Sequence, residues 1–176
     1  MPRGVVLEKY YPFVVSDPAL LSAVTLVIIS RLRFLQGQPH ATLPLLKLRG
    51  FVIDGIQIAL ADPVRSTSDQ IIMAVAIMSV YEALFGHKDL HRVHMEGLRR
   101  MIELRGGLNR LDLDGLLDPL LLWYDAHTAS VTRSSLALKG LGSSSMYRQV
   151  DKPLFLLGVT PAHESTPETA PQLLTK

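Results

Sequence analysis

Three histidines stand close together in the sequence and are the first residues to consider for chemistry: His87, His91 and His94. Spacings of four and three residues would place their side chains on one helical face, where imidazoles could bind zinc. His87, however, follows Gly86, a residue type that ends helices, so we expect it in a loop. We expect His91 to border the charged face of the next helix and His94 to border its apolar face. The interpretation that follows is that the protein binds no metal.

Other patterns that could support catalysis are incomplete. The chain has no cysteine, which excludes disulfides, thiol catalysis and zinc sites built from thiolates. Asp125 and His127 are separated by one residue, a spacing that directs two helical side chains to different faces. The sequence has neither the Gly-x-Ser-x-Gly turn of hydrolases nor the Gly-Lys-Ser/Thr order of a phosphate-binding loop. We predict no catalytic residues and no cofactor, so the protein is not expected to be an enzyme.

Composition and charge favour a globular protein. Hydrophobic residues make up 48% of the chain, charged residues 19%, and the net charge is only +2. Lysines and arginines are interspersed with acidic residues, so the pattern indicates neither a nucleic-acid surface nor a membrane surface. The longest apolar stretches, residues 18–30 and 71–81, are shorter than the roughly 20 residues that a membrane span needs. We therefore predict no membrane association.

Hydrophobic residues recur at helical spacing along most of the chain, and the breaks fall at Gly, Pro and Asp. Asp17 and Pro18 are typical of a helix start, and Gly37 of a helix end. The pattern predicts an all-α fold of about five packed antiparallel helices with an irregular C-terminal tail. The first helix begins at Asp17-Pro18. The next three span residues 43–60, 68–86 and 89–105, and the fifth begins at Asp118.

The spacing also predicts which helical faces are buried. The third helix is apolar on every side between residues 71 and 81, so we place it at the centre. In the fourth helix, Gly106 and Gly107 should supply a left-handed end. On its charged face we expect the pairs Arg92–Glu96, Glu96–Arg100 and Arg99–Glu103. The buried face of the first helix is predicted as Leu20, Leu21, Val24, Ile28, Leu32 and Leu35, and that of the fourth as Leu90, Val93, Gly97, Leu98, Met101 and Ile102.

The two ends of the chain lack such periodicity. Residues 1–15 are expected to be irregular, anchored by Tyr10, Tyr11, Pro12 and Phe13. Beyond Ser134 the composition changes, and we divide the chain into a helical domain, residues 1–133, and an irregular, partly disordered tail, residues 134–176. Within this tail, residues 154–159 could form a short strand or a docking segment. Residues after Thr160 are rich in Pro, Ser and Thr and are predicted to be disordered.

Short motifs follow one another in a distinctive order. After Leu60-Ala61-Asp62-Pro63 come Tyr81-Glu82-Ala83-Leu84-Phe85-Gly86, His94-Met95-Glu96-Gly97-Leu98, Glu103-Leu104-Arg105-Gly106-Gly107-Leu108 and Leu122-Trp123-Tyr124-Asp125. Over about residues 10–133 this order resembles the helical regulatory domain of fungal-specific transcription factors. That domain usually lies C-terminal to a binuclear zinc-cluster DNA-binding domain. The most specific part is the His-x-x-Gly-Leu helix running into Arg-Gly-Gly-Leu.

The resemblance implies that six residues are structural markers of the family and not a catalytic set: His94, Gly97, Arg105, Gly106, Gly107 and Asp125. The physical interpretation agrees with this. We expect Gly97 to lie on the apolar face of its helix and to let a neighbouring element approach. Arg105 stands in the last turn of the helix, where its charge favours the negative end of the helix dipole.

The resemblance also implies a role in regulating transcription and a nuclear location; without it, a cytoplasmic location would be expected. The six cysteines of a zinc cluster are missing from this sequence, so we predict no direct sequence-specific DNA binding by this chain. We predict that the domain binds another protein or a second copy of itself, or that it senses an effector. Two alternatives remain: a helical module that binds a small apolar ligand, or a truncated paralogue without function.

Overall fold

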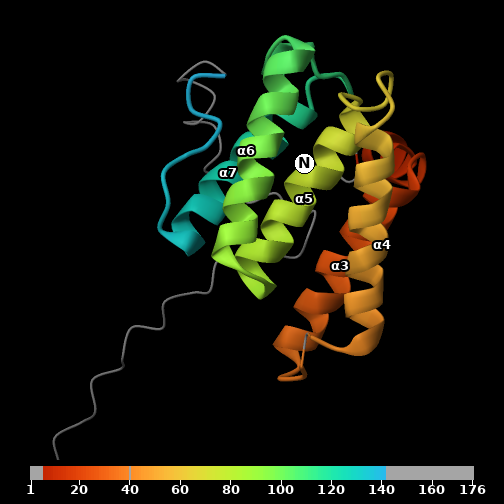
Figure 1. Cartoon of the computed structure of the whole chain (residues 1–176), viewed down its shortest axis with the longest axis vertical. Coiled ribbons are helices and arrows are strands. Elements are labelled where there is room, and N and C mark those ends of the chain that lie inside the picture. The colour runs from red at the N-terminus through yellow and green to blue at the C-terminus, as the bar shows by residue number, and fades with distance from the viewer. Residues whose placement is uncertain (1–5, 40, 142–176) are drawn as a thin grey trace, which may run out of the picture.

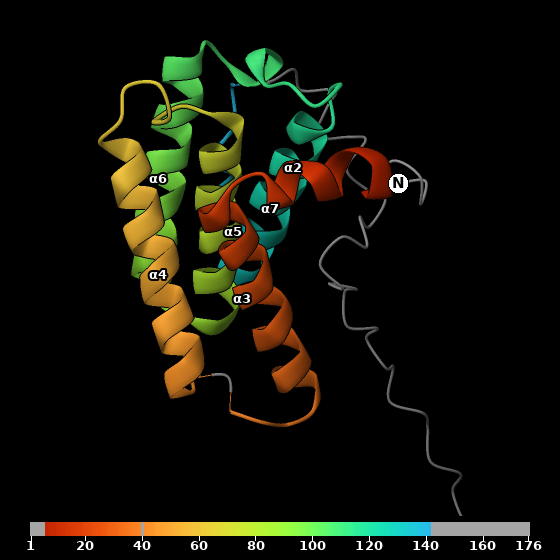
Figure 2. The same cartoon turned by 90° about the vertical axis from the view of Figure 1, so that its right-hand side faces the viewer.

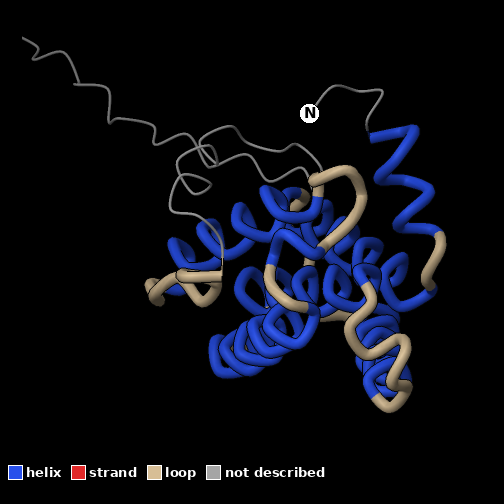
Figure 3. Tube along the Cα trace, turned by 90° about the horizontal axis from the view of Figure 1, so that it is seen from above, coloured by secondary structure: helices blue, strands red, loops and turns tan. Residues whose placement is uncertain are grey.

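The computed structural model describes residues 6–39 and 41–141, and this part of the chain is helical without any strand (Figure 3). The predicted all-α fold is confirmed. The predicted strand or docking segment at residues 154–159 and the predicted disorder after Thr160 lie outside the described residues. The elements in chain order are a π-helical turn η1 (Val6–Tyr10), α2 (Tyr11–Val15), α3 (Pro18–Leu35), α4 (Leu43–Leu60), α5 (Asp69–Phe85), α6 (Lys88–Arg105), a 3₁₀ turn η2 (Leu108–Arg110) and α7 (Leu117–Thr132).

Helix α5 lies at the centre of the molecule, as predicted. It contacts α3, α4, α6 and α7, which surround it (Figures 1 and 2). Every side chain from Ile71 to Glu82 is buried. A helix that is apolar on all sides is stable in water only when other helices cover all of its faces, and this requirement places the other helices around it.

Several helix ends are where the sequence places them. The Asp17 carboxylate accepts hydrogen bonds from the backbone N–H groups of Ala19, at 2.9 Å, and Leu20, at 3.1 Å. This cap satisfies donors that have no partner within the helix. Gly106 ends α6 with φ of +98°, so the predicted left-handed stop is confirmed. The bounds of α4 coincide with the predicted residues 43–60.

The N-terminal segment differs from the prediction. Residues 6–15 form η1 and α2 instead of an irregular stretch, and Tyr10 and Val14 are buried in the core. Pro12 stands at the start of α2, a position where proline's missing N–H costs nothing. The segment is too short to show a helical repeat, so spacing alone could not reveal it. Tyr11, an expected anchor, is exposed.

The buried face of α3 was predicted only in part, because Leu20 is buried as predicted and most of the other predicted residues are not. Leu21, Ile28, Leu32 and Leu35 are exposed, and the buried residues are Ala19, Leu20, Ala23, Leu26, Val27 and Ser30. Small residues let α3 and α4 approach closely, because a Cβ added to Gly55 of α4 would lie 3.0 Å from the Cβ of Ala19. Helix α3 is long and apolar enough to cross a membrane by length and composition alone, a property that core helices share.

The orientation of α6 also differs from the prediction. His91 and Met95 are buried together with Leu98, Met101 and Ile102, whereas Leu90 and Val93 are exposed. The pair Arg99–Glu103 forms with a 3.0 Å separation of Nε and Oε1, and Arg100 also approaches Glu103. The other two predicted pairs do not form within the described residues. Helix α6 begins at Lys88, with His87 before it, and α7 begins at Leu117, one residue before Asp118.

Candidate functional site

Asp125 fixes the chain segment that follows α7. Its carboxylate is buried and accepts hydrogen bonds from the backbone N–H groups of Ala137 and Leu138, both at 2.9 Å. Leu138 is thereby inserted into the core, where it has no exposed surface. His127 lies elsewhere, stacked on Trp123 with ring centroids 5.1 Å apart. Burial lowers the pKa of His127, and the Arg31 guanidinium lowers it further.

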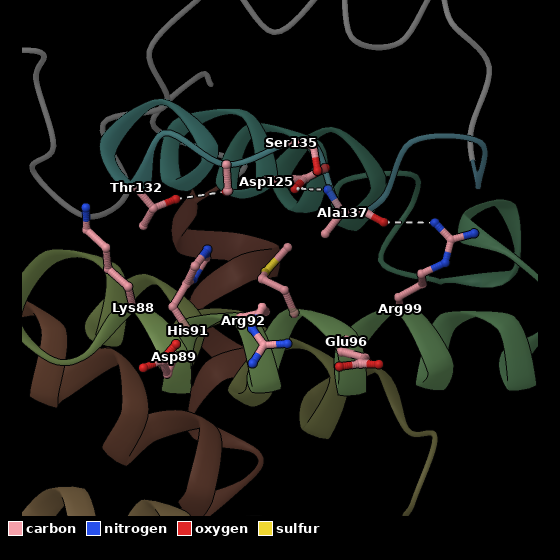
Figure 4. Close-up of a pocket in the computed structure, with 12 residues that line it drawn as sticks. Lys88, Asp89, His91, Arg92, Glu96, Arg99, Asp125, Thr132, Ser135 and Ala137 are labelled. Atoms are coloured by element: carbon pink, nitrogen blue, oxygen red, sulfur yellow. Dashed lines mark hydrogen bonds between the residues drawn. The ribbon is translucent and has the colours of Figure 1, made fainter.

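A cleft of about 460 Å³, the α6–α7 cleft, lies between α6 and the segment after α7 that Asp125 holds. Figure 4 shows His91 pointing from α6 toward α7, with Arg99 and Ala137 joined across one end of the cleft. Arg99 Nη1 donates to the carbonyl oxygens of Ala137, at 2.9 Å, and Lys139, at 3.2 Å. The other lining residues are Lys88, Asp89, Arg92, Met95, Glu96, Asp125, Thr132, Ser134 and Ser135.

The cleft is suited to binding a small molecule. Its volume is within the range of ligand sites, roughly 300–1,000 Å³. The Nδ1 atom of His91 lies 3.1 Å from the carbonyl oxygen of Ser79. Donation from Nδ1 to that carbonyl would leave Nε2 as the acceptor of the neutral ring. Apolar surface from Met95 and Ala137 lies beside it.

The Arg-Gly-Gly motif ties the end of α6 to the start of α5. Arg105 Nη2 lies 3.3 Å from Asp69 Oδ1, and Asp69 Oδ2 accepts the backbone N–H of Asp112 at 3.0 Å. Gly106 and Gly107 have φ values of +98° and +104°, which side chains rarely adopt. The predicted position of Arg105 in the last turn of α6 is confirmed, and its partner is a carboxylate in the first turn of α5. Burial raises the pKa of Asp118, and the Asp69 carboxylate raises it further.

A buried ion pair joins three helices and was missed at the sequence level. Arg49 of α4 places Nη2 2.6 Å from Oε1 of Glu82 in α5. Glu82 Oε2 also accepts the backbone N–H of His87, just before α6, at 3.1 Å. The Glu82 side chain is 1% exposed and that of Arg49 is 25% exposed. The available signal was one carboxylate that directly follows the fully apolar run of α5.

A second hollow, the α4–α6 groove, lies between α4 and α6. Its volume is about 550 Å³, and it contains two of the family-motif residues, His94 and Gly97. Burial lowers the pKa of His94. The remaining lining residues are Ile53, Ile56, Gln57, Leu60, Ser66, Thr67, Val75, Val93, Arg100, Met101 and Leu104.

The structure thus separates the residues singled out from the sequence. Asp125 borders the cleft, and His94 and Gly97 lie in the groove. Arg105 is the last residue of α6, and Gly106 and Gly107 form the turn after it. His91 is buried and does not border the charged face of α6 as predicted. Among the described residues, no three His, Asp or Glu side chains gather in a way that could hold a metal ion.

In the described part of the chain, helices surround one central helix, and motif residues cap and connect them. This helical scaffold carries the cleft beside α6 and the α4–α6 groove. The family model of the fungal specific transcription factor domain matches residues 10–160, which is most of the chain and extends past Arg133. The protein belongs to this family, which is one of transcription factor domains and not of enzymes. No curated protein and no solved structure matches the chain.

Proposed function

We propose that this domain regulates transcription in the nucleus by contacting another protein, and that the chain does not itself recognise a DNA sequence. The observation that carries the proposal is the open α4–α6 groove, whose rim exposes Leu60, Val93 and Leu104. Exposed apolar surface that is continuous with a hollow is typical of protein-binding sites. Family membership supports the regulatory role.

The arrangement of basic side chains argues against DNA recognition. DNA affinity arises mainly from lysines and arginines that neutralise phosphates, and specificity from an element placed in a groove. Carboxylates already face two of the four arginines of α6: Glu103 pairs with Arg99, and Asp69 pairs with Arg105. These acidic groups would repel phosphate. The sequence has no cysteine with which to build a zinc cluster.

Selection from a random-sequence DNA library at physiological salt tests this proposal. The purified chain is expected to retain only bulk DNA, weakly and with an affinity that falls steeply as salt rises. A zinc-cluster protein selected in parallel serves as the positive control. Enrichment of one sequence that the chain binds at least about 1,000-fold more tightly than bulk DNA would overturn the proposal.

Effector sensing is a second candidate function, and the α6–α7 cleft favours it. This cleft combines a buried imidazole and other polar groups with apolar surface from Met95 and Ala137, and sites for small molecules likewise combine polar groups with apolar surface. The Asp125 carboxylate anchors one wall of the cleft through two backbone N–H groups. A ligand bound there would contact α6 and the segment after α7 together.

A further inference from the structure

Gly97 occupies a position where nothing in the described part of the chain requires glycine. It lies in the interior of α6, where glycine destabilises a helix relative to alanine. A Cβ added to Gly97 would meet no atom within 4 Å, and the residue is exposed. The prediction that Gly97 lets a neighbouring element approach is therefore wrong within the described fold. Gly55 provides the contrast, because an added Cβ there would lie 3.0 Å from Ala19.

The missing side chain leaves the α4–α6 groove open. Helices α4 and α6 run in the same direction with α5 between and behind them (Figures 1 and 2), and Val75 of α5 contributes to the lining. From Val93 to Leu104 the α6 wall extends for about 16 Å, given a rise of 1.5 Å per residue. Such a length corresponds to about three turns of a helix laid along the groove.

The charge around the groove points to an acidic occupant. Among the described residues, its lining contains no carboxylate and one guanidinium, that of Arg100. The Arg100 side chain is 69% exposed and lies 3.7 Å from Glu103, so it is loosely held and can reach an incoming group. Burial lowers the pKa of His94, which disfavours a second positive charge in the groove. The groove thus combines apolar walls with one accessible positive charge near the end of α6.

We propose that the α4–α6 groove binds one amphipathic helix of a partner protein, with its apolar face over Gly97 and a carboxylate opposite Arg100. This inference rests on the proposed function and specifies where the protein contact occurs. Recognition of this kind uses apolar residues spaced i, i+3, i+4 and i+7 on the bound helix. The absence of a side chain at Gly97 lets the backbone of that helix approach α6.

A fluorescein-labelled peptide of about 16 residues tests this proposal, with leucines at the amphipathic spacing and glutamates beside them. Fluorescence anisotropy is measured against the full chain. We expect saturable binding that Gly97→Leu weakens by about tenfold or more, because the new side chain fills the groove. Gly97→Ala is the matched control, which should raise the melting temperature and retain most of the affinity. A scrambled peptide of the same composition should not bind.

Charge exchange tests the second part of the proposal. Arg100→Glu should weaken binding of the glutamate peptide and should favour a peptide with lysines in place of the glutamates. Equal affinities of wild type and Gly97→Leu would overturn the proposal. The proposal would also be overturned if the wild type does not bind the peptide but forms a dimer that Gly97→Leu dissociates, as measured by sedimentation. The occupant of the groove would then be a second copy of the chain. Failure of the wild-type chain to bind the peptide would overturn the groove proposal. It would leave the proposed regulatory function standing, since DNA selection tests that function separately.

Discussion

Arg49→Ala is expected to lower the free energy of unfolding by about 3 kcal/mol, because it leaves the buried Glu82 carboxylate without its cation. This value is the lower end of the range for broken buried pairs, since Arg49 is a quarter exposed. Urea unfolding followed by circular dichroism at pH 7 measures the change. The loss should be cooperative, since Glu82 connects α4, α5 and the residue before α6.

Two comparisons isolate the contribution of the ion pair. Arg49→Met combined with Glu82→Gln removes both charges while keeping an acceptor for the N–H of His87, and it should restore most of the stability. Arg100→Ala breaks an exposed pair and should cost about 0.5 kcal/mol or less. A change below about 0.5 kcal/mol for Arg49→Ala itself would show that the buried pair does not stabilise the fold.

Asp125→Ala is expected to destabilise the domain by about 3 kcal/mol, because it removes the acceptor of two buried or partly buried N–H groups. The effect should be concentrated after α7. Hydrogen exchange should accelerate at the amides of Ala137 and Leu138 far more than at those of α5. The release of this segment would also remove one wall of the α6–α7 cleft.

Asp125→Asn provides the matched variant for this position. Its amide keeps one acceptor oxygen and places donors toward the second N–H, so its destabilisation should approach that of the alanine variant. Unchanged protection of the Ala137 and Leu138 amides in Asp125→Ala would contradict the structural role assigned to the carboxylate. In that case the burial of Leu138 and the hydrogen bonds from Arg99 would hold the segment.

The sequence predicted the helix boundaries best where side chains mark them. The helix-breaking residues around α4 and the glycine at position 106 act locally. The predicted bounds of α4 and the predicted left-handed end of α6 are both confirmed. The buried face of α3 could not be predicted, because that helix carries apolar residues on nearly every side. Its buried face is the one that packs against other helices, including the close approach of Ala19 to Gly55 of α4. Such tertiary contacts leave no trace in helical spacing.

The candidate sites show the same division. Family motifs drew attention to Asp125 and Gly97, but not to what they do. The partners of Asp125 are backbone groups that return after α7 ends, and a periodic pattern contains no information about that return. Arg49 and Glu82 are 33 residues apart in the sequence. Only the packing of α4 against α5 brings them together.

The regulatory role itself is tested most directly by tethering. The chain is fused to an unrelated DNA-binding module in a fungal cell that carries a reporter gene with the matching operator. Because we propose that the domain acts through protein contact, the fusion should change reporter transcription several-fold relative to the DNA-binding module alone. Gly97→Leu should reduce this change and Gly97→Ala should retain it. A well-expressed nuclear fusion whose reporter output equals that of the DNA-binding module alone would contradict the account.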